Sequence, residues 1–366
     1  MNKKTRVLAI NPGSTSTKIA LFEDYDALFN ESVHHAADEL KNFSDIQSQL
    51  EFRMEMIERA MADKGFAMED VDVFSARGGG LISLESGIYA VSDLVISHAE
   101  KGMAGAHPAN LAPQIAKKYA DKFGKRAVVV NPPSIDEFCD EARITGVKGL
   151  YRQSHIHALN QKEIALRFCA ERGVKYSDVN IIICHLGGGI SVTAHEKGKM
   201  VDSNDIIKGS GPMTPTRAGD LPYISVIELA YSGDYTKKEL IDKLNKNGGL
   251  TDHFGTANVR DVMKMMDDGD QYARIVFRAM NYQISKYVGS MAVALKGKVD
   301  AIILTGGISN GVRITDMIRE YISWIAEVVV MPGEFEMEAL AAGAVRVVRG
   351  EEEEKTYTGK PVWPGY

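Results

Sequence analysis

Short apolar runs that end in turn residues recur along the chain and predict buried strands. The clearest cover residues 6–10, 71–75, 127–130, 180–184, 301–304 and 327–330. Runs of about four to eight apolar residues between turn signals are typical of strands buried on both faces. Between these runs, apolar residues recur at three- and four-residue steps in segments 46–61 and 275–295, which predicts helices that end at Gly65 and Gly297. Strands that alternate with helices indicate an α/β architecture.

The same series of predicted elements occurs twice. Residues 6–22 and residues 180–194 each contain a strand, a polar turn with glycine, and a second strand. In both halves a helix, a strand, another helix and a further strand follow. We favour duplication of an α/β domain over chance similarity, because the order of the elements and the residues in the turns agree together.

The duplication places a domain boundary near residues 151–157. We therefore expect a first domain of residues 1–155 plus 341–366, and a second domain of residues 156–340. A predicted helix that starts near Glu334 would return the chain to the first domain. The acidic run 351–355 is expected to be the solvated end of that helix, and residues 356–366 an extended tail.

Composition and charge remove several classes of function. The chain has 366 residues, of which 45% are hydrophobic and 25% charged, so it is expected to be globular rather than disordered. Its formal net charge of −6 offers no basic excess for nucleic acid or an anionic membrane. Cys139, Cys169 and Cys184 are too far apart for a CxxC pair. With no apolar run long enough for a signal peptide or a membrane span, we expect a cytoplasmic protein.

Glycine-rich turns follow four of the predicted strands, at Gly13, 78–80, 187–189 and 306–307. A turn without Cβ atoms lets backbone N–H groups approach an anion. The chain contains neither GxxxxGK[ST] nor a GxGxxG after a strand. We therefore expect phosphate groups to be held between two domains rather than by either of these motifs.

The first of these turns also carries polar side chains, which are Asn11, Ser14, Ser16 and Lys18. The last three alternate and would share one face of an extended strand. The functional interpretation is a set of hydrogen-bond donors beside phosphate. The alternative is an ordinary hairpin that faces solvent.

The motifs taken together resemble the acetokinase family over nearly the whole chain. They are, in order, NPGSTSTK (11–18), ARGGG (76–80), HLGGGISV (185–192), TPTRAGDLP (214–222), GGL (248–250), NVRDV (258–262), LTGGISN (304–310) and PGEFEMEALAAGA (332–344). Acetate-specific relatives carry a His in the first Arg-containing loop and HLGNG in the second. This chain has neither, which favours the butyrate branch of the family.

This resemblance implies a fold of duplicated actin-like, ribonuclease-H-like ATPase domains with a cleft between them. It also implies reversible, Mg²⁺-dependent transfer of the γ-phosphoryl group of ATP to butyrate, which gives an acyl phosphate and ADP, and a homodimer. The first domain would be the carboxylate side, and the second would bind the nucleotide. Alternatives are a kinase for isobutyrate, propionate or another branched acid, a weakened or inactive paralogue, and an actin- or chaperone-like nucleotide-binding module.

Arginine and histidine are the candidates for the chemistry. Arg77 and Arg217 match arginines that contact substrate in the family, and a guanidinium is a rigid fork for carboxylate and phosphate oxygens; the alternative is surface salt bridges. His185 matches a residue that stabilises the transferring phosphoryl group, although a buried histidine is often only a structural donor. His157 matches a histidine near the substrate.

The resemblance also assigns cofactor ligands. ATP or ADP would contact the first turn together with Gly187, Gly188, Gly189, Asn258, Val259, Arg260, Gly306, Gly307, Ile308 and Asn310. Mg²⁺ prefers oxygen ligands, and Glu338 matches the family glutamate at the metal, with Asn11 nearby. Glu334 and Glu336 leave the register of that glutamate open.

One residue departs from the family pattern. The family has an Asp after the strand that ends here at Val130, and this chain has Asn131. An amide cannot act as a base, but it can orient the acid or a metal-bound water. Several interpretations stay open: Asp136 substitutes, activity is reduced, the Asp is dispensable because the nucleophile is already an anion, or this chain has another role.

Overall fold

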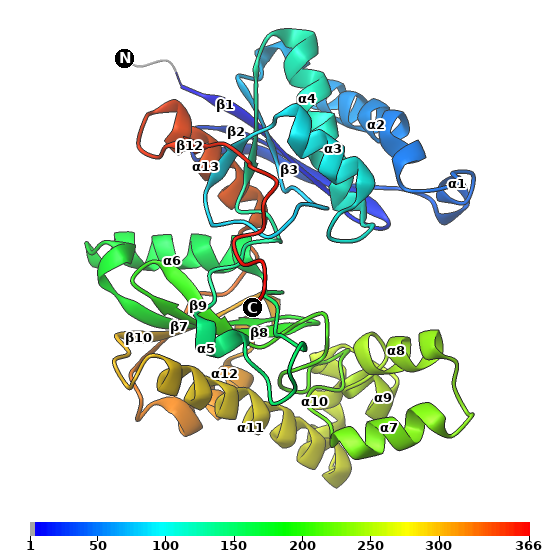
Figure 1. The fold of residues 1–366 in the computed structure, drawn as a ribbon, viewed down its shortest axis with the longest axis vertical. Helices are drawn as coiled ribbons and strands as arrows, with labels where there is room; N and C mark the ends of the chain where they lie inside the picture. The colour runs from blue at the N-terminus through cyan, green and yellow to red at the C-terminus, as the bar shows by residue number, and fades with distance from the viewer. Residues whose placement is uncertain (1–3) are drawn as a thin grey trace. The chain divides into compact units, whose positions relative to one another are not determined.

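The computed structural model describes residues 4–366. The chain folds into two compact units (Figure 1). Unit 1 contains residues 1–136, 158–163 and 335–366, and unit 2 contains residues 137–157 and 164–334.

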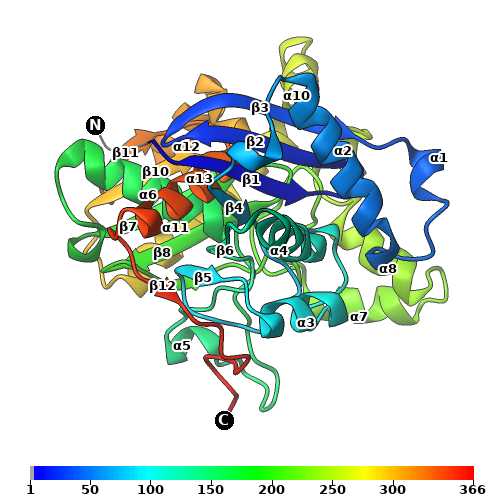
Figure 2. The same cartoon turned by 90° about the horizontal axis from the view of Figure 1, so that it is seen from above.

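Unit 1 is built on one mixed sheet with the strand order β12-β5-β6-β4-β1-β2-β3 (Figure 2). Strands β1, β2 and β3 are antiparallel neighbours, while β1, β4 and β6 run parallel. The strands are β1 (Arg6–Pro12), β2 (Ser16–Glu23), β3 (Asp26–His34), β4 (Val73–Ala76), β5 (Ile88–Ala90), β6 (Arg126–Val130) and β12 (Glu354–Lys355). The helices are α1 (Ala37–Leu40), α2 (Leu50–Asp63), α3 (Asp93–Lys101), α4 (Leu111–Phe123) and α13 (Glu336–Val348).

Both faces of the central strands of this sheet are buried, as the continuous apolar runs predict. In β1, Leu8 and Ile10 belong to a core with residues of α2 and α4. Val7 and Ala9 belong to a core with α13 on the other face. Side chains alternate along a strand, so a strand covered on both faces must be apolar at every position.

Unit 2 repeats the central part of this sheet, with the order β11-β10-β7-β8-β9. Its strands are β7 (Asn180–Leu186), β8 (Ile190–Glu196), β9 (Lys199–Ser203), β10 (Ala301–Thr305) and β11 (Glu327–Val330). Its helices are α5 (Asp140–Arg143), α6 (Ala158–Arg172, whose residues 158–163 belong to unit 1), α7 (Tyr223–Tyr231), α8 (Lys237–Asn245), α9 (Leu250–Phe254), α10 (Val259–Asp267), α11 (Gln271–Ala294) and α12 (Val312–Ile322). Helices α11 and α12 pack on one face of the sheet, and α6 lies along the other (Figure 1).

The duplication predicted from the sequence is confirmed by pairing and register. Strands β7, β8 and β9 correspond to β1, β2 and β3, while β10 and β11 correspond to β4 and β6. The second and third strands of each set shift register, between Leu21 and Phe22 in unit 1 and between Ala194 and His195 in unit 2.

The two long predicted helices form near the expected positions. Helix α11 begins after Asp270, whose side chain accepts a hydrogen bond from the backbone N–H of Ala273 at 3.0 Å, a common way to satisfy a free N–H at a helix start. It ends just before Gly297, which has φ +73°. Helix α2 ends in the same way before Gly65, with φ +78°.

Candidate functional site

The β1–β2 hairpin places the first polar turn at the end of the unit 1 sheet. The backbone N–H of Gly13 donates to the Ser16 carbonyl at 2.7 Å and closes the turn. Thr17 is buried, while Ser16 is half-buried and Lys18 exposed, so these two share the face opposite Thr17. Ser14 is exposed in the turn itself, where strand alternation does not apply. That these side chains contact phosphate stays a prediction.

A buried cluster that the sequence analysis missed supports this turn. Arg53 of α2 is fully buried and donates from Nη1 to the Thr17 hydroxyl at 3.0 Å and to the Ser16 carbonyl at 3.3 Å. Nε2 of His35 lies 2.9 Å from the same hydroxyl. The sequence did contain one sign of this cluster, which is a charged residue on the apolar face of a predicted helix. Arg53 shares the buried face of α2 with Met54 and Ile57.

Burial changes the titration of both groups in this cluster. Desolvation lowers the pKa of Arg53 to about 10, which leaves it charged at neutral pH. Desolvation, assisted by the charge of Arg53, lowers the pKa of His35 to about 4. His35 is therefore neutral at neutral pH, and the buried cation lies directly behind the turn.

Arg77, Asn11 and Glu336 come together in unit 1 from three separate segments. Arg77 Nη2 lies 3.4 Å from Glu336 Oε1, and its Nη1 donates to Asn11 Oδ1 at 3.3 Å. Asn11 Nδ2 donates to Glu336 Oε2 at 2.9 Å. The Nε of Arg77 is buried and has no hydrogen-bond partner. Buried N–H groups are rarely left unpaired, so a further acceptor fits here.

The glutamate beside Asn11 is Glu336, rather than the Glu338 expected from the family match. Glu338 lies two residues further along α13 and is half-buried, and its assignment to the metal stays a prediction. A carboxylate and an amide oxygen suit Mg²⁺, which usually keeps several waters. Among residues 4–366, no group of three or more His, Cys, Asp and Glu is placed to hold a metal. Oδ1 of Asn11 already accepts from Arg77, and the Glu336 carboxylate already pairs with Arg77 and Asn11. That these residues hold magnesium, with phosphate and water as further ligands, stays a prediction.

The three glycines after Arg77 pack closely against neighbouring parts of unit 1. All of them are buried. Gly78 has φ +74°, and a Cβ there would lie 2.6 Å from Cγ1 of Val129. A Cβ at Gly79 would lie 2.8 Å from the backbone N of Asn110. These glycines let the loop pack tightly against β6 and the start of α4, and so fix the backbone next to Arg77.

Asn131 is held by Gly87. Its backbone N–H donates to the Gly87 carbonyl at 3.0 Å, and its Oδ1 accepts from the Gly87 N–H at 2.9 Å. Its φ of +39° lies in the left-handed region, which Asn tolerates better than most residues. The structure thus gives Asn131 a structural use, and its catalytic role stays a prediction. Asp136, the alternative, is also buried.

In unit 2, the HLGGG turn is joined to the TPTR segment. The hydroxyls of Thr214 and Thr216 both donate to the carbonyl of Gly188, at 2.7 and 2.9 Å. The Thr214 hydroxyl also accepts from the backbone N–H of Arg217 at 3.0 Å. Gly188 itself is exposed, so the outer surface of this turn is open to a ligand.

The two predicted histidines lie against each other in unit 2. His185 is buried at the end of β7, and its ring stacks on that of His157 with centroids 4.1 Å apart. Nδ1 of His157 lies 2.9 Å from the Ser191 hydroxyl. The structure therefore brings together both residues that the sequence placed near the reacting groups.

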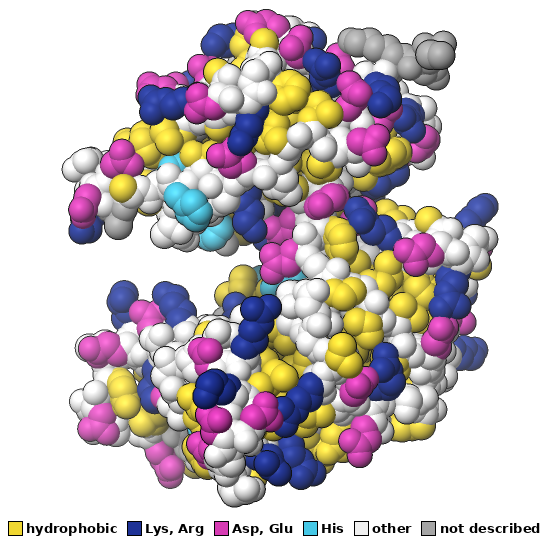
Figure 3. Space-filling model, turned by 180° about the vertical axis from the view of Figure 1, so that it is seen from behind, with side chains coloured by type: hydrophobic (Ala, Val, Ile, Leu, Met, Phe, Trp, Pro, Cys, Tyr) yellow, Lys and Arg dark blue, Asp and Glu magenta, His cyan; other side chains and the backbone are white. Residues whose placement is uncertain are grey.

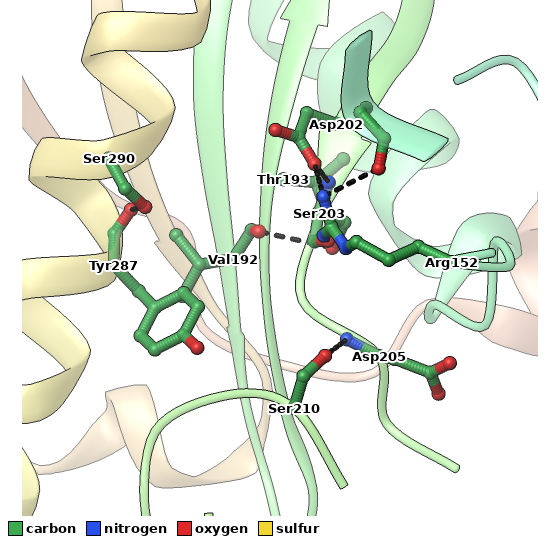
Figure 4. Close-up of polar contacts among 10 residues, drawn as sticks. Arg152, Val192, Thr193, Asp202, Ser203, Asp205, Ser210, Tyr287 and Ser290 are labelled. Atoms are coloured by element: carbon green, nitrogen blue, oxygen red, sulfur yellow. Dashed lines mark hydrogen bonds and ion pairs between the residues drawn. The ribbon is translucent and has the colours of Figure 1, made fainter. Parts of the chain in front are cut away.

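Arg217 also has an unpaired group. Its Nη1 is buried without a hydrogen-bond partner. Burial lowers the pKa of its guanidinium, and the negative charge of Asp205 opposes that shift. Asp205 lies in the loop after β9, where its backbone N–H donates to the Ser210 hydroxyl at 3.2 Å (Figure 4). Burial alone would raise the pKa of Asp205, but hydrogen bonds from His155 and from backbone N–H groups bring it below its usual value.

The residues assigned to adenosine differ in exposure. Asn258 begins α10, and its Oδ1 accepts the backbone N–H of Arg260 at 3.1 Å. Gly306 is buried, with φ +88°, and a Cβ there would lie 2.8 Å from the backbone N of Leu186. Gly307 and Asn310 are exposed. Gly306 therefore serves packing. Gly307 and Asn310 lie at the surface, where the Asn310 amide donates to the Gly307 carbonyl at 2.9 Å.

Comparison with known proteins matches the chain to the acetokinase family and to short-chain carboxylate kinases. The model of the acetokinase family matches residues 149–341. The chain is 42% identical over 354 residues to butyrate kinase 2 of Clostridium acetobutylicum, covering 97% of this chain and 99% of that protein. It is 42% identical over 352 residues to a probable butyrate kinase of Clostridium botulinum, covering 96% and 99%. The crystal structure of Porphyromonas gingivalis acetate kinase matches with a TM-score of 0.76 and 20% identity, over 94% of this chain and 100% of that one.

The chain belongs to the acetokinase family. Its fold is that of the acetate kinases, so the predicted duplication of an actin-like ATPase domain is confirmed.

Proposed function

We propose that this protein is an ATP-dependent butyrate kinase, which reversibly converts butyrate and ATP into butyryl phosphate and ADP. The observation that carries this proposal is the 42% identity to butyrate kinase 2 across nearly the full length of both chains. The unpartnered buried N–H groups of Arg77 and Arg217 support it from the structure, because each guanidinium has room for an anionic oxygen.

The reaction needs charge stabilisation more than base catalysis. A carboxylic acid with a pKa near 4 to 5 is ionised at neutral pH, so its oxygen attacks the γ-phosphorus without prior proton removal. The new O–P bond forms as the bond to the β,γ-bridging oxygen breaks, and ADP leaves with that electron pair. The protein must hold the two oxygens in line and stabilise charge on the equatorial oxygens.

We assign Arg77 and Arg217 to the carboxylate and the transferring phosphoryl group. His185 donates a hydrogen bond to the phosphoryl group, and His157 lies next to the acid. The stacking of the two rings supports this pair, since each ring limits the orientations open to the other. Asn131 stays in the proposal as a residue that orients the acid, although Gly87 already occupies its amide oxygen.

We assign the nucleotide to unit 2 and the carboxylate side to unit 1. Phosphates would contact Gly187, Gly188 and Gly189 together with Asn11, Ser14, Ser16 and Lys18. The adenosine would contact Asn258, Val259, Arg260, Gly306, Gly307, Ile308 and Asn310. Asn11 and Glu336 would hold Mg²⁺, which supplies positive charge to the phosphate oxygens when bound.

The main alternative within the family is a different acid, such as isobutyrate or propionate. One methylene in an apolar pocket is worth only about 1–3 kcal/mol, so closely related acids would compete. An actin- or chaperone-like module without acyl transfer is not favoured, because hydrolysis of ATP alone gives no reason for two arginines with unpaired N–H groups.

The test is to trap the acyl phosphate with hydroxylamine in the presence of ATP, Mg²⁺ and a series of two- to six-carbon acids. We expect the highest kcat/KM for butyrate. Arg217→Ala should lower kcat/KM for the acid by two orders of magnitude or more, since aligned charge stabilisation is the main catalytic term. A folded wild-type protein that makes no acid-dependent hydroxamate would overturn the proposal.

We further propose a cytoplasmic homodimer. The free thiols of Cys139, Cys169 and Cys184 support a reducing compartment. Among residues 4–366, no helix has the length and apolar character needed to span a bilayer. Helix α7 supports self-association, because Tyr223, Ile224, Ile227 and Tyr231 are all exposed on it. Sedimentation equilibrium at micromolar concentration tests the dimer, and a monomer would contradict it.

Opposite charges are interspersed on the face of the molecule that Figure 3 draws. That no nucleic acid or anionic membrane is a partner stays a prediction from the formal net charge of −6, because such ligands need a concentrated basic patch. A small carboxylic acid and ATP are therefore the proposed partners.

A further inference from the structure

Two features meet at one atom of Arg217. Its Nη1 is buried and has no hydrogen-bond partner. The same atom occupies the space in which a Cβ of residue 189 would lie. A Cβ built at Gly189 would lie 2.8 Å from Cζ of Arg217 and 3.2 Å from Nη2, and nearer still to Nη1. Real Cβ atoms essentially never approach another heavy atom closer than 3.0 Å. Any side chain at position 189 would therefore displace the guanidinium.

The backbone of Arg217 cannot take up this displacement. Its carbonyl accepts from the N–H of Thr214 at 3.0 Å, and its N–H donates to the Thr214 hydroxyl at 3.0 Å. The next residue, Ala218, donates to the Leu244 carbonyl at 2.9 Å. Gly249 packs so closely that a Cβ there would lie 2.7 Å from the Arg217 carbonyl. The side chain alone is free to move.

The turn, in contrast, tolerates an added methyl group. Neither Gly188 nor Gly189 adopts a left-handed φ, so alanine at either position brings no backbone strain. The bond that closes the turn runs between the N–H of Gly187 and the carbonyl of Gly189 at 3.2 Å, and it involves no side chain. Alanine at position 189 should leave the fold intact while it moves the guanidinium.

We propose that Gly189 is a positioning residue. Because it has no side chain, the Arg217 guanidinium can occupy the space next to its Cα, with Nη1 directed to an oxygen of the acid or of the transferring phosphoryl group. This inference rests on the proposed kinase function. It gives Gly189 a task distinct from that of Gly188, which lies in the same turn but whose added Cβ would approach Thr216 no closer than 4.0 Å.

The experiment compares Gly189→Ala with Gly188→Ala, which adds the same methyl group one residue away. Hydroxamate formation gives kcat, KM for butyrate and KM for ATP, and a thermal melt checks the fold of each variant. We expect Gly189→Ala to lower kcat/KM for butyrate by about 10- to 100-fold, the cost of displacing a positioning group by about 1 Å. If the added methyl group also disturbs phosphate binding, it should do so in both variants, and this effect should change KM for ATP. Equal values of kcat/KM for butyrate in the two variants would overturn the proposal.

A double-mutant cycle with Arg217→Ala shows whether the effect runs through the arginine. We expect Gly189→Ala to cause no further loss once Arg217 is replaced. The cycle is measured both in residual turnover and in butyryl phosphate binding by calorimetry, so a turnover too slow to measure still gives a result. If Gly189→Ala lowered kcat/KM for butyrate as much in the Arg217→Ala protein as in the wild type, the proposed positioning of Arg217 by Gly189 would be contradicted. Wild-type protein that makes no acyl phosphate would instead contradict the kinase function.

Discussion

Asn131 combines a left-handed backbone with a side chain that is already hydrogen-bonded. Replacement by alanine should remove the bond to the Gly87 N–H and leave a residue that tolerates this φ poorly. We expect Asn131→Ala to lower the free energy of unfolding by about 2–3 kcal/mol, the sum of a lost buried hydrogen bond and left-handed strain. Urea unfolding measures this change, and an unchanged midpoint would show that the Gly87 contact contributes nothing.

The matched variant Asn131→Asp restores the residue type of the family. A carboxylate can accept the same N–H, and Asp also tolerates a left-handed φ, so we expect stability close to that of the wild type. If the Asp is dispensable because the nucleophile is already an anion, kcat should change by less than about threefold, well under the 10²–10⁴ typical of a general base. A gain of that larger size would instead show that a carboxylate is needed here.

His35 should make stability depend on pH. Its pKa is about 4 in the folded protein and about 6.5 when unfolded. The unfolded chain therefore takes up a proton first as the pH falls. Burial of neutral His35 therefore contributes to the free energy of unfolding above pH 6.5. This contribution, about 3 kcal/mol in total, is lost as the pH falls from 6.5 towards 4.

Urea unfolding between pH 7 and 4 measures the His35 effect as the difference between the wild type and His35→Gln. Glutamine can still bond to the Thr17 hydroxyl but does not titrate. The variant should lose less stability on acidification than the wild type. Parallel pH curves for the two proteins would refute the assignment of His35.

The sequence predicted some residues of the candidate site and missed others. His157 and His185 were both singled out, and their rings stack. The glutamate register could not be assigned, because PGEFEME offers three acidic residues and only the start of α13 decides that Glu336 reaches Asn11. Arg53 and His35 were missed because their partners come from β2 and α2, and no local pattern reports contacts between them.

Two glycines in helix interiors allow a prediction about helix packing. A Cβ at Gly343 of α13 would lie 2.6 Å from Cγ1 of Val130 in β6, whereas a Cβ at Gly289 of α11 would meet nothing within 4 Å. In a helix interior, alanine is more favourable than glycine by about 1 kcal/mol. Gly289→Ala should therefore raise the free energy of unfolding by up to about 1 kcal/mol.

Gly343→Ala makes the same chemical change but must push the helix away from the sheet. Overpacking of this kind typically costs about 1–3 kcal/mol, so the variant should be destabilised although its helix propensity improves. Chemical denaturation of both proteins gives the comparison. Stabilisation by Gly343→Ala would mean that α13 and β6 are not in the close contact described.

The central strands and long helices were predicted from the sequence because their signals are strong. Continuous apolar runs such as Ile181–Ile183 belong to strands covered on both faces. Strand β3 was missed because most of its residues are not fully buried and its apolar pattern is weak. Strands β5 and β12 are too short to form a pattern.

The acidic run after α13 was expected to be a solvated helix end, and this was wrong. Helix α13 stops at Val348, and Glu354 and Lys355 pair in parallel with Ile88 and Tyr89. The following tail is anchored as well, since Tyr357 is buried and its hydroxyl accepts the N–H of Ile82 at 2.9 Å. Edge pairing of this kind depends on a distant strand, and local composition does not report it.

Each unit has its own apolar core, with unit 1 built around β1 and unit 2 around β7. We therefore expect calorimetric unfolding in two steps, with a calorimetric enthalpy above the van't Hoff enthalpy. ADP with Mg²⁺ at about 100 times its Kd should stabilise the unit that binds it by about 2.7 kcal/mol. A single two-state transition that moves as a whole with ADP would contradict independent cores.

The path of the chain through unit 1 has a consequence for protein synthesis. Helix α13 covers one face of the unit 1 sheet, yet it follows every residue of unit 2 in the sequence. A ribosome adds residues from the N-terminus at about 5–20 per second, so the β1–β2–β3 hairpins emerge first with one apolar face uncovered. Unit 2 can complete its fold while that face is still exposed to water and to chaperones. The unit made first is therefore the one finished last.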